Sequence, residues 1–143
     1  MPMSSTAAMT QPSVGAPLRA GLWVAQALIA ALFCFAGFTK LTTPIPELAA
    51  MMPWTGDVPA WFVRSIALVD LAGGIGVLLP ALTGIQPRLT TLAALGCIVL
   101  QLLAAAFHVS RGEFSVLPVN ALLLACAVFV FWGRSRDPRF KLI

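Results

Sequence analysis

Four long apolar stretches constrain the fold of this chain more than any other feature of its sequence. They cover residues 20–38, 61–82, 89–108 and 117–132. A helix needs about 20 such residues to cross a hydrocarbon core about 30 Å thick, and these stretches approach that length. They lack the alternation of apolar and polar residues that is typical of barrel strands. Because a backbone in lipid must satisfy its own hydrogen bonds, we predict an all-α, transmembrane four-helix bundle.

The charge content agrees with lipid as the solvent of the folded chain. Only 10% of the 143 residues are charged, against about 25% in a soluble domain, and the mean hydropathy is +0.94. We expect one membrane domain over residues 19–134, preceded by a flexible tail over residues 1–18 and followed by a basic tail over residues 135–143. The first apolar stretch exceeds the roughly 7–15 residues of a secretory signal, so we expect it to remain as a membrane helix.

The distribution of Lys and Arg predicts the orientation in the membrane. The side that holds both termini is assigned Arg19, Arg88, Arg134, Arg136, Arg139 and Lys141, and the other side is assigned Lys40, Arg64 and Arg111. Cytoplasmic segments carry the excess of Lys and Arg in membrane proteins. We therefore predict a multi-pass protein of the plasma (inner) membrane, in contact with membrane lipids, with both termini in the cytoplasm.

The segment between the first two apolar stretches is rich in proline. Four prolines lie between residues 39 and 60, and between them residues 47–52 are expected to form a short helix at the membrane interface. We expect Trp54 and Trp61 to lie at headgroup depth, where amphipathic rings are favoured.

The sequence argues against several classes of function. The basic residues form no stripe with interleaved aromatic residues, so we expect no nucleic-acid binding. Cys34, Cys97 and Cys126 form no C-x-x-C pair and have no metal-ligand spacing with histidine, so we expect neither dithiol chemistry nor a metal site. The glycines of residues 72–76 follow no strand, which excludes a phosphate loop, and we attribute them to close helix packing.

Asp70 is the residue that helix packing does not explain. It lies near the middle of the second apolar stretch, where a carboxylate costs about 3 kcal/mol even on lenient scales unless it is protonated, paired or hydrated. Lys40 ends the first stretch and lies nearer the membrane surface. We therefore expect a water bridge between Lys40 and Asp70 rather than direct contact.

Further polar residues fall in the same half of the predicted bundle. Gln101 and His108 share one face of the third stretch, Glu113 lies in the next loop, and Asn120 lies about one turn into the fourth stretch. They predict a polar pocket, although the basic groups could instead extend to the interface and the amides could link helices by hydrogen bonds. The candidates for ligand binding or proton relay, without an assigned catalytic role, are Lys40, Asp70, Gln101, His108, Glu113 and Asn120.

The same segments resemble those of a known family. AGFTKL at residues 36–41 is similar to the A-G-x-x-K-L signature of DoxX-like proteins, and VDLAGGIGVLLP at residues 69–80 is similar to their acidic segment, with Asp70 in a position where Glu is more usual. FHVSRGEF at residues 107–114 is similar to the last hairpin of the family. The resemblance covers roughly residues 20–134 and implies a four-helix membrane protein. It also implies that Lys40, Asp70, His108 and Glu113 occupy motif positions of the family.

The resemblance also implies a redox association, because relatives such as DoxD are associated with a thiosulfate:quinone oxidoreductase. Our first hypothesis is an accessory subunit that binds a quinone-like or lipidic amphiphile and has no covalently bound cofactor. The sequence offers no haem ligand pair, cluster cysteines or flavin fingerprint. Electrons would therefore come from a membrane or redox protein partner, and we lean toward no catalytic activity of its own.

Two alternatives stay open. One is a small permease or lipid/ligand-binding protein; because four spans are few for alternating access, a permease would require a homo-oligomer. The other is a structural assembly subunit without its own chemistry.

Overall fold

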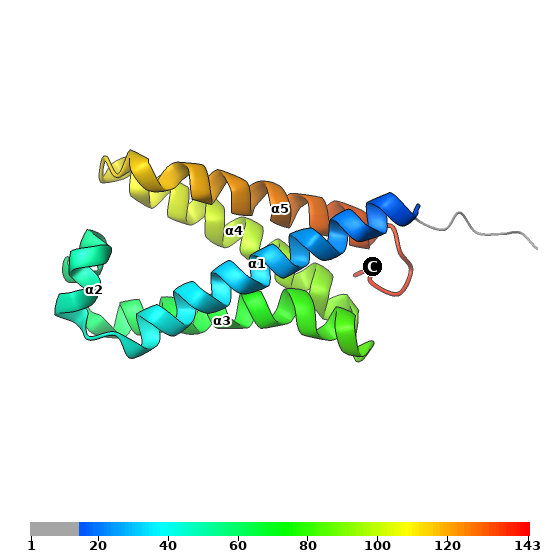
Figure 1. Ribbon diagram of the computed structural model, residues 1–143, viewed down its shortest axis with the longest axis horizontal. Helices are drawn as coiled ribbons and strands as arrows, with labels where there is room; N and C mark the ends of the chain where they lie inside the picture. Colours follow the sequence, from blue (N-terminus) through cyan, green and yellow to red (C-terminus); the bar gives the residue numbers. More distant parts are fainter. Residues whose placement is uncertain (1–14) are drawn as a thin grey trace, which may run out of the picture.

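The structure is a computed structural model that describes residues 15–143. Its helices are α1 (Ala16–Thr42), α2 (Ile45–Met51), α3 (Ala60–Thr83), α4 (Arg88–Ser110) and α5 (Leu117–Ser135), with short 3₁₀ turns η1 (Pro53–Gly56) and η2 (Phe114–Val116). No strand occurs in this range. The helices α1, α3, α4 and α5 are long and apolar enough to cross a membrane, which confirms the predicted all-α bundle of four spans (Figure 1).

The helix ends follow the prolines and glycines of the sequence. Pro59 immediately precedes α3, where a missing N–H does no harm, and Gly84 ends it with a φ of +70° that favours glycine. Helix α1 begins at Ala16, so residues 16–18 belong to the helix rather than to the expected tail. The first fourteen residues of that tail lie outside the described residues.

Helix α1 runs obliquely across the bundle (Figure 1). Near its start, Gly21 faces the ring of Phe129 in α5. Near its end, Gly37 lies against the backbone of Ala67 in α3. Helix α1 therefore moves away from α5 and onto α3 as it proceeds. We call the end of the bundle that holds Ala16 and the residues after α5 the terminal end, and the opposite end the capped end.

The capped end is covered by α2 and η1, which connect α1 to α3 (Figure 1). Leu48, Trp54 and Val63 form a small apolar cluster there, and Trp54 is only 8% exposed. Trp61, in contrast, is 67% exposed. Of the two tryptophans expected at headgroup depth, only Trp61 therefore presents its ring to the surroundings. The ring of Trp54 contributes apolar area inside the protein instead, because the turn of η1 directs it onto Leu48.

Glycines allow the long helices to approach closely. A Cβ atom added to Gly37 would lie 2.7 Å from the carbonyl oxygen of Ala67, and one added to Gly74 would lie 2.7 Å from Sγ of Cys34. A Cβ on Gly133 would overlap the side chain of Leu22. These contacts support the assignment of the small residues to packing, which is how helices associate where lipid supplies no hydrophobic drive.

The apolar core has two parts of unequal size. The larger part fills the middle and terminal end of the bundle and includes Ile29, Phe33, Val77, Ala94, Cys97, Ala127 and Val130. The smaller part is the cluster of Leu48, Trp54 and Val63 at the capped end. Buried polar side chains of α1, α3 and α4 lie between these two parts, and they form the candidate site.

We predict that Gly37→Ala destabilises the bundle, because its Cβ would meet backbone that cannot move without separating α1 from α3. Overpacking of this kind costs about 1–3 kcal/mol. Gly96→Ala is the matched control, since nothing lies within 4 Å of its added Cβ. Unfolding of the purified proteins in detergent should show a loss of stability only for Gly37→Ala. Equal stability of the two variants would contradict the close α1–α3 contact.

Candidate functional site

Lys40 and Asp70 form a direct ion pair between α1 and α3. Nζ of Lys40 lies 2.7 Å from Oδ2 of Asp70, and the side chains are only 11% and 9% exposed. The expected water bridge between them is therefore wrong. Helix α1 continues to Thr42, so Lys40 is still helical and lies one turn after Gly37, where α1 touches α3. From that position the long lysine side chain reaches the carboxylate without any bending of the chain.

Arg64 closes the end of α1 beside this ion pair. Its Nη1 donates hydrogen bonds to the carbonyl oxygen of Lys40 and, at 2.9 Å, to that of Thr43. These carbonyls belong to the last turn of α1 or follow it, where the helix provides no partner of its own. Arg64 therefore stabilises the end of α1. It is also one of the basic residues from which the orientation in the membrane was predicted.

Gln101 lies at the level of Asp70 on the neighbouring helix. Gly73 of α3 packs against Cys97 of α4, and Gly76 packs against Ala93. Because the two helices are antiparallel, Asp70, one turn before Gly73, lies opposite Gln101, one turn after Cys97. Gln101 is 7% exposed, and its Oε1 has no hydrogen-bond partner within residues 15–143. Such an atom is uncommon, because buried polar atoms are nearly always paired.

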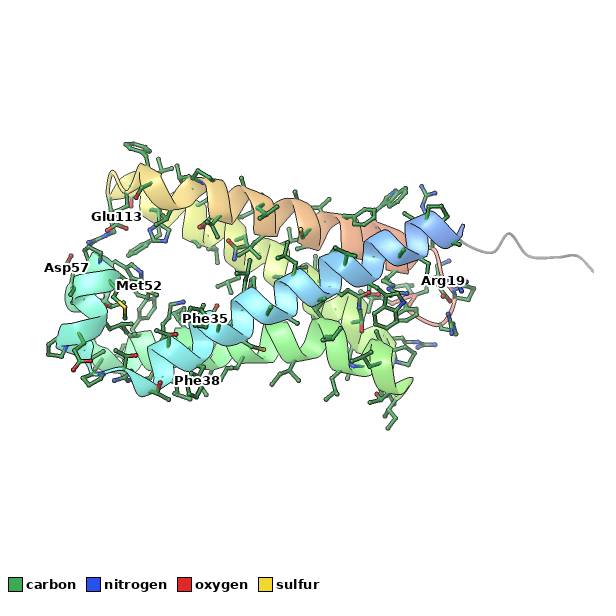
Figure 2. The ribbon with its side chains drawn as sticks, in the orientation of Figure 1. Arg19, Phe35, Phe38, Met52, Asp57 and Glu113 are labelled. Carbon is green, nitrogen blue, oxygen red and sulfur yellow. The ribbon has the colours of Figure 1, made fainter. Side chains whose placement is uncertain are left out.

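His108 and Glu113 lie in a separate polar cluster at the capped end. Nδ1 of His108 is 2.7 Å from Oε2 of Glu113, and Nε of Arg111 donates to Oε1 of Glu113 at 2.8 Å. Nη2 of Arg111 also donates to Asp57, at 2.5 Å. Figure 2 shows Glu113 and Asp57 close together at this end. The cluster thus joins the segment after η1 to the turn between α4 and α5.

This cluster keeps Glu113 ionised. The hydrogen bonds from His108 and, second, from Arg111 hold the pKa of Glu113 below its usual value. Because an ionised carboxylate only accepts hydrogen bonds, Nδ1 of His108 is the donor. The pKa of Arg111 is raised by its bonds to Asp57 and Glu113. The imidazole is therefore oriented by a carboxylate, as in sites that transfer protons.

Asn120 does not join either group. It is half-buried in α5, in a part of that helix where no residue before Leu123 is buried. At this end of the bundle α1 packs on α3, where Gly37 meets Ala67. The six candidate residues therefore do not surround one pocket. Lys40, Asp70 and Gln101 form an inner polar layer. His108 and Glu113 form an outer pair about two helical turns away at the capped end, where Phe107 packs against the apolar cluster around Val63.

The terminal end holds a polar network that was not predicted from the sequence. Gln26 is fully buried, and its Nε2 donates to the carbonyl oxygen of Val77 at 2.8 Å. Its Oε1 accepts from Nε and Nη2 of Arg134 at 2.8 and 2.5 Å. Thr91 of α4 donates to the carbonyl oxygen of Phe140 at 2.7 Å. An isolated glutamine within an apolar stretch was the available signal, whereas Arg134 was used only in the charge count that predicts the orientation.

Comparison with known proteins supports the interpretation as a membrane protein. The model of a family described as the DoxX-like family matches residues 24–130, which contain α3 and α4 in full, most of α1 and α5, and both members of the inner ion pair. No curated protein and no solved structure gives a significant match. With four apolar helices, the match identifies an integral, multi-pass membrane protein.

The ion pair generates a prediction about stability. Asp70→Leu leaves the ammonium of Lys40 buried without a partner, which costs about 3–5 kcal/mol. The double variant Lys40→Met/Asp70→Leu replaces both charges by apolar groups and should recover most of that loss. Unfolding in detergent and the yield of folded protein measure both effects. An Asp70→Leu single variant as stable as the unaltered protein would contradict a structural contribution of the pair.

Proposed function

The chain belongs to the DoxX-like family, and from this premise we propose that it is a redox-associated accessory subunit that binds a quinone-like amphiphile within the bilayer. The proposed binding position is the inner polar layer of Lys40, Asp70 and Gln101. An amphiphile of this kind suits a site with a few polar groups inside a largely apolar bundle.

The observation that carries the proposal is the unpartnered Oε1 of Gln101. A buried acceptor without a partner costs about 1–3 kcal/mol, so a ligand that supplies a donor gains affinity there. The amide of glutamine also has two N–H donors. It can therefore accept from a hydroxyl group or donate to a carbonyl group, and these are the polar groups of a quinone in its reduced and oxidised forms.

Lys40 fits the same ligand. An ammonium group has three N–H donors, and the described hydrogen bonds use one of them, on Asp70. A remaining donor could bind a ligand carbonyl while Asp70 holds the lysine side chain in position. A bound quinone would supply reversible electron and proton transfer, and the proposal assigns the supply of electrons to a redox protein partner.

An apolar groove between α3 and α4 suits the tail of such a ligand. It contains two hollows of about 530 and 410 Å³ that share Leu92. Val69 and Leu100, which line the first hollow, immediately precede Asp70 and Gln101 in sequence. A long apolar tail could therefore lie in this groove at the level of the inner polar layer and continue toward the terminal end.

One observation favours a second candidate function. Lys40 and Asp70 satisfy each other's charge, and Arg64 holds the end of α1. The same residues thus fix two helices relative to each other, which is what a structural assembly subunit without its own chemistry would require. Such a subunit would bind no quinone, so a binding experiment separates the two candidates.

We predict that a photoreactive quinone analogue labels the protein in lipid nanodiscs and that Gln101→Leu weakens this labelling about tenfold, since it removes the hydrogen-bonding amide. The matched control is the exchange Gln101→Leu/Leu102→Gln, which keeps the composition but moves the amide to a neighbouring position where Leu102 is 53% exposed. It should label as weakly as Gln101→Leu. Equal labelling of all three proteins would contradict binding at Gln101 and leave the structural candidate.

We also propose that the protein lies in the plasma (inner) membrane with its terminal end in the cytoplasm. Six Lys and Arg residues at the terminal side against three at the other side support this orientation. A reporter that works only in the cytoplasm should give a signal when it is fused after Ile143. The opposite result, with signal only from fusions in the segment between α1 and α3, would reverse the orientation.

A further inference from the structure

Arg134 is a buried cation at the terminal end of the bundle, and it forms no ion pair with any of residues 15–143. It is 5% exposed, and no carboxylate lies within 4 Å of it in residues 15–143. A buried charge is normally paired, because its removal from water is expensive. Within the described residues, no anion is therefore bound directly to the guanidinium group of Arg134.

The protein fixes this guanidinium group without neutralising it. Nε and Nη2 both donate to the amide oxygen of Gln26, which is itself held by the carbonyl oxygen of Val77. The rings of Trp23 and Phe140 each lie 4.7 Å from the guanidinium carbon. A neutral amide and two aromatic rings orient the group and attract it, but they bring no negative charge.

Part of the guanidinium group remains available to a ligand. Nη1 makes no hydrogen bond with the described residues. It is not fully buried either, so part of its surface remains accessible. The nearest carboxylate, that of Asp137, is already bound to Arg139, at 2.7 Å from its Nη2. Arg19 and Arg139 add positive charge near Arg134. The local balance is therefore cationic.

The depth of Arg134 identifies the anion. It lies in the last turn of α5, where an apolar span ends, and the ring of Trp23 lies against it. Aromatic rings and basic residues at such a level face the lipid headgroups. A planar guanidinium group binds phosphate oxygens with more than one N–H, which an ammonium group cannot do with the same geometry.

We propose that Arg134, held by Gln26 and accompanied by Arg19, binds the phosphate group of an anionic phospholipid at the terminal end of the bundle. This site is distinct from the inner polar layer of Lys40, Asp70 and Gln101, and it does not depend on quinone binding. One bound lipid would supply the missing negative charge and join α1 and α5 through its headgroup.

The test compares lipid with free phosphate on the purified protein in detergent. Added phosphatidylglycerol should raise the melting temperature of the unaltered protein and remain bound in native mass spectrometry, whereas phosphatidylcholine should do so less. Inorganic phosphate should give little shift, because it lacks the acyl chains. A shift with inorganic phosphate as large as that with the lipid would overturn the assignment to a lipid headgroup.

Three variants locate the site. Arg134→Lys keeps the charge but loses the planar donor group, and it should bind phosphatidylglycerol about tenfold more weakly. Gln26→Leu/Arg134→Met removes the whole polar network in favour of apolar side chains and should abolish the lipid-dependent shift while the bundle stays folded. Arg136→Gln is the matched control from the same segment, since Arg136 stacks on Trp132 instead, and it should respond as the unaltered protein does.

Two results would overturn the proposal. An undiminished response of Arg134→Lys would show that the planar group is not used. Equal lipid binding by Arg136→Gln and by the folded double variant would show that the headgroup binds elsewhere. If the double variant fails to fold, the comparison of Arg134→Lys with Arg136→Gln decides the question on its own.

Discussion

The close contact between α1 and α3 is the constraint on which the rest of the structure depends. Gly37 and Gly74 allow the two backbones to meet at two places along their length. This contact turns α1 away from α5 toward the capped end and fixes the position of Lys40 beside α3. The ion pair with Asp70 is a consequence of that geometry. In a membrane, where helices gain little by hiding apolar surface from one another, small residues and a few polar bonds determine which helices are neighbours.

The two ends of the bundle manage polar groups in different ways. At the capped end, acidic and basic side chains neutralise one another, and Arg111 connects Asp57 to Glu113 across two separate loops. At the terminal end, basic side chains predominate, and the buried Arg134 is surrounded by an amide and aromatic rings. This asymmetry follows the distribution of charge that governs membrane insertion. If the proposed orientation and lipid site are both correct, the same basic residues set the orientation and bind the lipids of one leaflet.

The sequence predicted the four spans well and the candidate site less well, for physical reasons. Apolar length and proline position are local properties, so the helices and their order could be derived from them. The direct contact of Lys40 with Asp70 depends on the approach of α1 to α3 at Gly37, which is a tertiary property. A lysine near the end of an apolar stretch looks like a side chain that extends to the interface. The contact of Arg134 with Gln26 could not be predicted for the same reason, because only the fold brings together these residues, which are 108 positions apart in the chain.

The division of the apolar core has a consequence for the dynamics of the chain. Regions with few buried apolar contacts open at lower free energy than the molecule as a whole. The cluster of Leu48, Trp54 and Val63 is small, and it joins the rest of the protein through the packing of Trp54 on Phe107 and through the bond of Arg111 to Asp57. The capped end should therefore behave as a separate cooperative unit, whose backbone amides exchange with solvent sooner than those around Ile29 and Val130. Each such opening would bring water to Lys40 and Asp70 while the helices around the larger core stay assembled.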